Sequence, residues 1–106
     1  MSLERIIKAL VSLGLTRLEA EVYVYVAQNG PQTVIELDLA LNYSKNQIYS
    51  SLKNLTTKKL VNQDGLTFSA LPFEEALDLL IKMEKEQAQI MQESKEELLA
   101  TWKTKD

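Results

Sequence analysis

Apolar residues recur at the spacing of an α-helix in the first part of the chain. Between residues 3 and 13 they fall on one side of a helix, and the glycine at position 14 suits the left-handed backbone that ends many helices. This apolar side is wider than a short surface helix needs, so we expect the C-terminal part of the chain to cover it. Its members are Leu3, Ile6, Ile7, Leu10 and Leu13.

Three further helices are each predicted to begin at a capping box. In this motif a Ser or Thr side chain accepts the backbone N–H of the residue three positions later, whose Glu or Gln side chain accepts the N–H of the Ser or Thr. The helices are expected over residues 16–28, 33–41 and 44–59. The boxes are Thr16 with Glu19, Thr33 with Glu36, and Ser44 with Gln47.

The segment 16–28 carries two conflicting signals. Its stretch from Val22 to Val26 alternates valine and tyrosine, which favours a strand. Leu18, Val22 and Val26 lie at helical spacing behind the capping box, however, with Tyr25 beside them. Because intrinsic propensity is a weak guide, we predict a helix whose core face these residues form.

Beyond Leu60 the apolar pattern changes from a helical period to alternation. Residues 60–63 and 66–70 flank Asp64-Gly65, a pair typical of the tight turn of a β-hairpin. Two short helices joined by a brief turn and followed by a hairpin make a winged helix-turn-helix. We therefore predict a mainly α fold with a small β-hairpin, in which residues 1–71 form the winged helix-turn-helix domain.

Residues 72–106 are predicted to form a second unit, a long C-terminal helix. Pro72 suits its first turn, and the pattern continues to about residue 103, which corresponds to ~45 Å of helix. So small a domain cannot cover that length. Steps of four and three residues give the heptad pattern of a coiled coil, so we expect a dimer with a second copy, either parallel or antiparallel. The expected dimerisation residues are Leu77, Ile81, Ala88, Met91, Leu98 and Trp102, with Glu84 and Lys95 as two polar interruptions of the same row.

Charge is distributed unevenly along the chain. The net charge is −3, which by itself argues against a nucleic-acid partner. Residues 1–70 carry seven Lys or Arg against six Asp or Glu, however, whereas residues 71–106 carry five against nine. No acidic residue occurs between Asp38 and Asp64, and four lysines lie there. The helix at 44–59 is therefore the positive segment of the chain, and it suits contact with DNA.

The chain contains neither cysteine nor histidine. This excludes disulfides, the usual zinc sites, and nucleophile–base pairs built on these residues. Acid pairs such as Glu74-Glu75 lie on predicted helix surfaces, and the three glycines form no phosphate-binding loop. We therefore expect no enzyme, no metal and no cofactor. No signal peptide and no apolar span of ~20 residues is present, so we expect a cytoplasmic protein without a membrane partner.

The solvent side of the 44–59 helix supplies the candidate contacts to double-stranded DNA, together with a residue at the start of the preceding helix. Some candidates have a structural alternative. Gln47 and Thr33 take part in capping boxes, and Tyr49 would either reach a phosphate or a thymine methyl group or pack on Leu37. The candidate set is Lys45, Asn46, Gln47, Tyr49, Ser50, Lys53, Thr57 and Thr33.

Four segments of the sequence together carry a family resemblance. Residues 13–23 read LGLTRLEAEVY, residues 44–55 read SKNQIYSSLKNL, residues 58–61 read KKLV, and residues 74–77 read EEAL. In this order they resemble the TrmB-like winged-helix transcriptional regulators over residues 13–81. The resemblance implies a dimeric DNA-binding regulator with the 44–59 helix in the major groove. In the expected dimer, the two recognition helices would lie one or more turns of DNA apart, at ~34 Å per turn, on a palindromic site.

Three features depart from the family pattern. The wing carries no Lys or Arg between Lys59 and Lys82, whereas basic residues are common at the wing tip of the family. Lys59 stands where a glycine is usual, so the helix is expected to end differently, although Lys58 and Lys59 would both complement a helix C-terminus. Larger members continue into a sugar-binding effector domain, whereas this sequence has 106 residues, so we expect no small-molecule effector here. The alternative function is a protein–protein interaction module with little DNA affinity.

Overall fold

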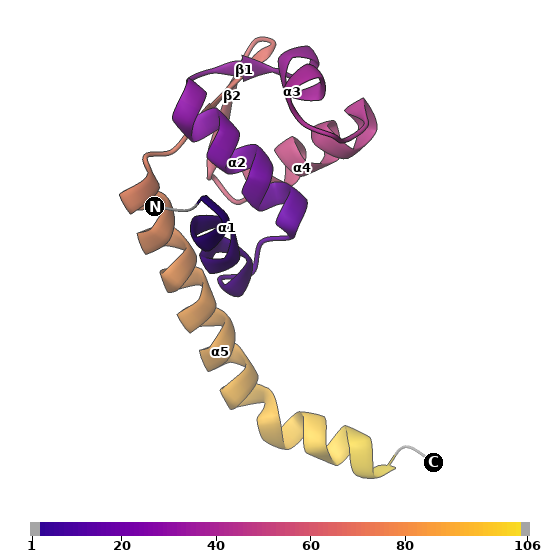
Figure 1. Ribbon diagram of the computed structural model, residues 1–106. Helices are drawn as coiled ribbons and strands as arrows, with labels where there is room; N and C mark the ends of the chain where they lie inside the picture. Colours follow the sequence, from indigo (N-terminus) through magenta and orange to yellow (C-terminus); the bar gives the residue numbers. More distant parts are fainter. Residues whose placement is uncertain (1–2, 105–106) are drawn as a thin grey trace.

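The computed structural model describes residues 3–104, which form five helices and three strands (Figure 1). Four helices and the strands build a winged helix-turn-helix domain, and the fifth helix leaves this domain as a long arm. The molecule measures 51 × 29 × 27 Å along its principal axes. The elements are α1 (Leu3–Ser12), α2 (Arg17–Asn29), β1 (Gln32–Thr33), α3 (Val34–Ala40), α4 (Lys45–Thr57), β2 (Val61–Asp64), β3 (Thr67–Ala70) and α5 (Phe73–Thr104).

All three predicted capping boxes are confirmed. At α2 the Thr16 hydroxyl accepts the Glu19 N–H at 3.1 Å, and Glu19 Oε1 accepts the Thr16 N–H at 3.0 Å. The same reciprocal pairs begin α3 and α4. The helix N-termini could therefore be predicted from four-residue patterns, because each box satisfies backbone donors that would otherwise lack partners.

One hydrophobic core holds the domain together, and it differs from the predicted core of α2 in one respect. Leu18 and Tyr25 are only half-buried, whereas Tyr23 is the largest fully buried side chain at 1% exposed. The Tyr23 hydroxyl donates a hydrogen bond to the Leu71 carbonyl, between the sheet and α5. This distant partner lets a polar tip lie inside. The other fully buried side chains include Leu10, Val22, Val26, Leu37, Ile48, Leu52, Leu55 and Leu60.

The wing is a three-stranded antiparallel sheet in the order β1-β3-β2. The hairpin β2–β3 was predicted, but β1 was not, since Thr33 was expected to begin the third helix. Gln32 pairs with Phe68 and Thr33 with Thr67. The reason is that an N-cap residue has extended dihedrals, here φ −92° and ψ 166° at Thr33, so the same residue can end a strand and cap α3.

Helix α4 ends in a Schellman motif, which corrects the expectation drawn from Lys59. The Lys59 N–H bonds the Thr56 carbonyl at 3.0 Å, and the Leu60 N–H bonds the Leu55 carbonyl at 2.9 Å. Lys59 adopts the left-handed φ of 67° that a glycine would take. The helix therefore ends as it would with glycine, and the lysine bears the steric cost.

The long helix α5 has 32 residues, or ~48 Å, and only its first part packs on the domain. Ala76 and Leu80 are buried in the same core as Ile7 and Leu10 of α1. Figure 1 shows α1 alongside this part of α5 and the rest extending away. The expected cover for the apolar side of α1 is thus present. None of the helices in residues 3–104 is apolar enough over a sufficient length to cross a membrane.

Candidate nucleic-acid interface

Helix α4 has one buried and one exposed side. Ile48, Leu52 and Leu55 face the core and are completely buried. The opposite side carries short polar and basic side chains, and the helix contains no acidic residue. One side therefore fixes α4 on the domain and leaves the other free to enter a groove. Its exposed residues are Lys45, Asn46, Gln47, Tyr49, Ser50, Lys53, Asn54 and Thr57.

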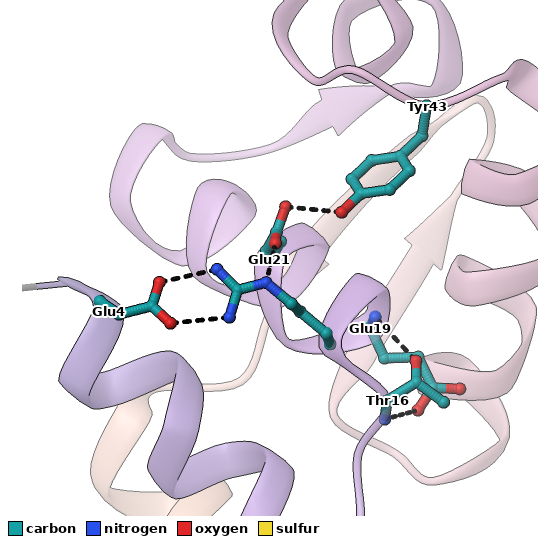
Figure 2. Close-up of polar contacts among 6 residues, drawn as sticks. Glu4, Thr16, Glu19, Glu21 and Tyr43 are labelled. Atoms are coloured by element: carbon teal, nitrogen blue, oxygen red, sulfur yellow. Dashed lines mark hydrogen bonds and ion pairs between the residues drawn. The ribbon is translucent and has the colours of Figure 1, made fainter.

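Arg17 connects α1 to the turn that precedes α4. Figure 2 labels the other members of this chain of contacts, Glu4, Glu21 and Tyr43. The Arg17 guanidinium donates two hydrogen bonds of 2.7 Å to the Glu4 carboxylate, and its Nε lies 2.8 Å from Glu21 Oε2. The other oxygen of Glu21 accepts a hydrogen bond of 3.0 Å from the Tyr43 hydroxyl. Because Tyr43 immediately precedes the N-cap Ser44, this chain of contacts positions the start of α4.

The protonation states in this chain of contacts favour its persistence near neutral pH. The hydrogen bond from Arg17 lowers the pKa of Glu4, because it favours the charged carboxylate. The hydrogen bond to Glu21 raises the pKa of the Tyr43 hydroxyl, because it favours the protonated phenol. Glu4 therefore stays a charged carboxylate and Tyr43 a protonated phenol, which are the forms that their hydrogen bonds require.

Glu19 fixes the other half of α4. Its side chain is buried at 4% exposed, although it is charged. The Asn54 amide donates a hydrogen bond of 3.0 Å to Oε2, and Lys58 Nζ lies 3.6 Å from Oε1, the oxygen that also accepts the Thr16 N–H. One carboxylate thus caps α2 and holds α4 against it. Lys58 has a structural partner and is not a free cation of the α4 surface.

Two of the candidate residues serve the backbone in the structure. Gln47 Oε1 accepts the Ser44 N–H at 3.0 Å, and the Thr33 hydroxyl accepts the Glu36 N–H at 3.2 Å. Thr33 also lies in β1, apart from the seven candidates on α4. The structure therefore groups those seven on one helix surface and leaves Thr33 to one side.

Tyr49 lies on the solvent side and not in the core. It is 55% exposed, whereas Leu37, its alternative packing partner, is buried. With Lys53 and Thr57 it lines a shallow pocket between α4 and the wing, to which Gln63 and Phe68 also contribute. Of the two roles predicted for Tyr49, the exposed one fits this position.

The wing tip adds no positive charge to this surface. It consists of Asp64, Gly65 and Leu66, and Leu66 is 82% exposed. The turn is held locally, since the Thr67 hydroxyl donates to the Asp64 carbonyl at 2.9 Å and the Gln63 amide donates to the Gly65 carbonyl at 3.1 Å. The positive charge of this surface therefore comes from the lysines of α4.

The residues that hold α4 in place were not predicted from the sequence. Arg17 and Glu21 were four apart on a predicted helix, a spacing that signals an ion pair. Nothing in the sequence, however, indicated that Glu4 would meet Arg17, Tyr43 would meet Glu21, or Asn54 would meet Glu19. These pairs are 13 to 35 residues apart in the chain. Within residues 3–104 there is also no cluster of three or more Asp or Glu that could hold a metal ion.

Comparison with known proteins places these features in a family. The sequence profile described as "Sugar-specific transcriptional regulator TrmB" matches residues 10–72, which is more than half of the chain. No curated protein sequence matches the chain. Among solved structures, TrmBL2, an archaeal chromatin protein, superposes with a TM-score of 0.79 at 21% sequence identity. The match covers 96% of this chain and 41% of the TrmBL2 chain, so the chain spans about two fifths of the length of that relative.

Proposed function

Because the chain belongs to the TrmB family of transcriptional regulators, we propose that it binds double-stranded DNA as a homodimer and regulates transcription. Each protomer would place α4 in a major groove, and α4 is called the recognition helix from here on. The structural relative TrmBL2 binds DNA, by a mode described as novel, which supports a DNA partner without specifying the contacts.

The observation that carries this proposal is the acid-free exposed surface of the recognition helix. Lys45 and Lys53 stand on it two turns apart, with no carboxylate in the helix to neutralise them. Lysines near phosphates release condensed counterions, which gives affinity without sequence preference. Although the whole chain is negative, the field that DNA meets at close range is that of this surface, because charges beyond ~10 Å are screened.

Sequence preference would come from the short polar side chains between these lysines. Asn46 can make paired hydrogen bonds to an adenine edge, and Ser50 can donate to or accept from a base. Tyr49 is placed to reach a phosphate or a thymine methyl group from the side of the wing. The contacts of Arg17 and Glu19 would hold these side chains in one orientation, so that they dock without reordering the helix.

The dimer would be formed by the exposed part of α5. Ile81, Met91, Leu98 and Trp102 are 41, 51, 50 and 72% exposed, and they recur at heptad spacing on one side of the helix. A row of large apolar side chains in water marks an interaction surface. A second copy would cover the row and set two recognition helices on one duplex.

A fluorescence-polarisation titration of the purified protein with a random-sequence duplex at low salt tests the proposal. We expect binding at micromolar concentrations that weakens as salt rises. Ser50→Glu, which places a negative charge in the middle of the surface, should abolish binding, whereas the control Ser12→Glu, at an exposed position of α1, should not. Absence of binding by the unaltered protein at tens of micromolar would refute a DNA-binding role.

That negative result would favour the second candidate function, a protein–protein interaction module. One observation supports it: Leu39 and Leu66 are each 82% exposed, and Ile35, one turn before Leu39 on α3, is 59% exposed. The pairing of Thr33 with Thr67 brings the start of α3 beside the hairpin turn (Figure 1). An apolar surface at the wing tip suits a protein partner better than a phosphate backbone.

A further inference from the structure

The exposed row on α5 contains two charged residues that have no ionic partner among residues 3–104. Glu84 and Lys95 interrupt the heptad row of apolar side chains, and both are exposed. Neither makes an ion pair with any other residue of the described chain, 3–104. They lie 11 residues apart, or ~16 Å along the helix, so they cannot pair with each other within one chain.

We infer that two α5 helices pair antiparallel, so that Glu84 of each copy meets the partner's Lys95; this rests on the homodimer of the proposed function. The row is symmetric about a point midway between positions 89 and 90. Reversing a second copy about that point therefore places every member of the row opposite another member. The pairs are Leu77 with Trp102, Ile81 with Leu98, Glu84 with Lys95, and Ala88 with Met91.

A parallel pair would lack this complementarity. Two-fold symmetry in a parallel homodimer aligns each residue with its own copy, so Glu84 would face the partner's Glu84 and Lys95 the partner's Lys95. Like charges face to face in a seam are destabilising, and they are a common device against a wrong pairing. The antiparallel arrangement converts the same four charges into two attractive pairs. The two polar interruptions thus specify the orientation and the register of the helices.

The surface of α5 has the shape that such a pair requires. Six side chains of one side form a shallow groove, and these are Ala88, Met91, Gln92, Lys95, Leu98 and Leu99. The groove begins at the two-fold axis, where Ala88 is small and the partner's Met91 can fill the space, and it continues toward the C-terminus. At the outer ends, Trp102 would cover the partner's Leu77, which is only half-buried by its own domain.

The domain covers only the N-terminal end of the row. Ala76 and Leu80 are buried in the core and Leu77 packs against it. The row is exposed from Ile81 onward. At the junction, the Glu84 carboxylate lies over Gly14 after α1, 2.8 Å from where a Cβ would stand. The partner's Lys95, on its long stem, would meet the carboxylate at this edge of the domain.

The antiparallel pair also fixes the separation of the two domains. Leu77 of one copy would lie opposite the partner's Trp102, so the two Leu77 positions would be 25 residues of helix apart, or ~38 Å. This separation is close to one turn of DNA, ~34 Å. The domains would stand at opposite ends of one rod.

Disulfide trapping tests the orientation without background, because the chain contains no cysteine. Ile81→Cys and Leu98→Cys are prepared separately, at two exposed positions. In the antiparallel pair, each position lies ~25 Å from its own copy, so neither variant alone cross-links. When the two variants are mixed and their subunits are allowed to exchange, the mixed dimer should become covalent under mild oxidation. A covalent dimer from Leu98→Cys alone would overturn the inference in favour of the parallel pair, and a dimer in solution that cross-links in neither experiment would overturn the register.

Charge exchange gives an independent readout. Glu84→Lys and Lys95→Glu should each raise the dimer dissociation constant about tenfold or more, measured by sedimentation equilibrium, and the double variant should restore it. Two unaffected single variants would contradict the pairing. A monomeric unaltered protein at tens of micromolar would refute the dimer itself, while the titration with DNA would still report separately on the recognition helix.

Discussion

Asn54 of the recognition helix donates a hydrogen bond of 3.0 Å to Glu19 of α2, whose carboxylate is buried and also caps its own helix. A single carboxylate therefore serves one backbone partner, the Thr16 N–H, and two side-chain partners, Asn54 and Lys58. Because charge-assisted hydrogen bonds in a buried site are strong and directional, this pair sets the angle between α2 and the recognition helix. The exposed side of the recognition helix is thus held in place by contacts within the domain.

Glu19→Ala should destabilise the domain more than the loss of a helix cap alone would. It removes the bond to the Thr16 N–H and leaves the Asn54 amide without its carboxylate, so we expect a loss of about 3 kcal/mol in the free energy of unfolding. Urea denaturation followed by circular dichroism measures it. Glu36→Ala is the matched control, since Glu36 occupies the same place in the α3 capping box but is exposed, and about 1 kcal/mol is expected there. Equal losses would show that the contact with Asn54 contributes nothing.

Lys59→Gly should stabilise the domain. Lys59 has a positive φ of 67° in the Schellman motif that ends the recognition helix, where glycine carries no steric penalty. We expect a gain of about 1 kcal/mol, seen as a higher midpoint in urea. The neighbouring Lys58 has φ −80°, so Lys58→Gly is the control and should destabilise instead. A loss of stability in Lys59→Gly would indicate that the lysine side chain makes a contact worth more than its strain.

Lys53→Ala should weaken DNA binding through the phosphate contacts alone. Removing one phosphate contact lowers the slope of log K against log salt by about one for each protomer bound. Polarisation titrations over a salt series measure this slope. Lys82→Ala on α5 provides the control, because it removes the same charge from an exposed site far along the chain from the recognition helix. If the salt slope of Lys53→Ala equals that of the unaltered protein, Lys53 makes no phosphate contact.

Tyr23 should make the stability depend on pH in the alkaline range. Burial raises the pKa of its hydroxyl from 10.0 to about 12. The folded state therefore keeps its proton to higher pH than the unfolded state, so stability is full below pH 10, falls between pH 10 and 12, and levels off above. The total loss from this group is at most about 3 kcal/mol.

Tyr23→Phe separates this effect from the titration of the lysines and other tyrosines. The variant loses the hydrogen bond to the Leu71 carbonyl, so it should be about 1 kcal/mol less stable at neutral pH. The difference in unfolding free energy between the two proteins should then shrink or reverse as pH rises through the window. A constant difference from pH 8 to 12 would show that Tyr23 ionises equally in both states.

The sequence by itself determined the local elements of this protein. Each capping box contains both of its partners within four residues, Asp64-Gly65 makes its own turn, and the heptad row of α5 is a property of one helix. The solvent side of the recognition helix was likewise readable, because Ile48, Leu52 and Leu55 marked the side that had to be buried. These features need no knowledge of distant residues, so pattern and spacing were sufficient.

Only the tertiary structure decided how these elements are joined. It showed β1 beside β3, Tyr23 as the largest fully buried side chain, and the contacts of Arg17 and Glu19 that hold both ends of the recognition helix. Each depends on two residues that meet only after the chain has folded, and a single side chain such as Glu19 offers the same oxygens to many possible partners. The physical reason is that helix and turn signals are local, whereas the choice among long-range partners is made by the packing of the whole core.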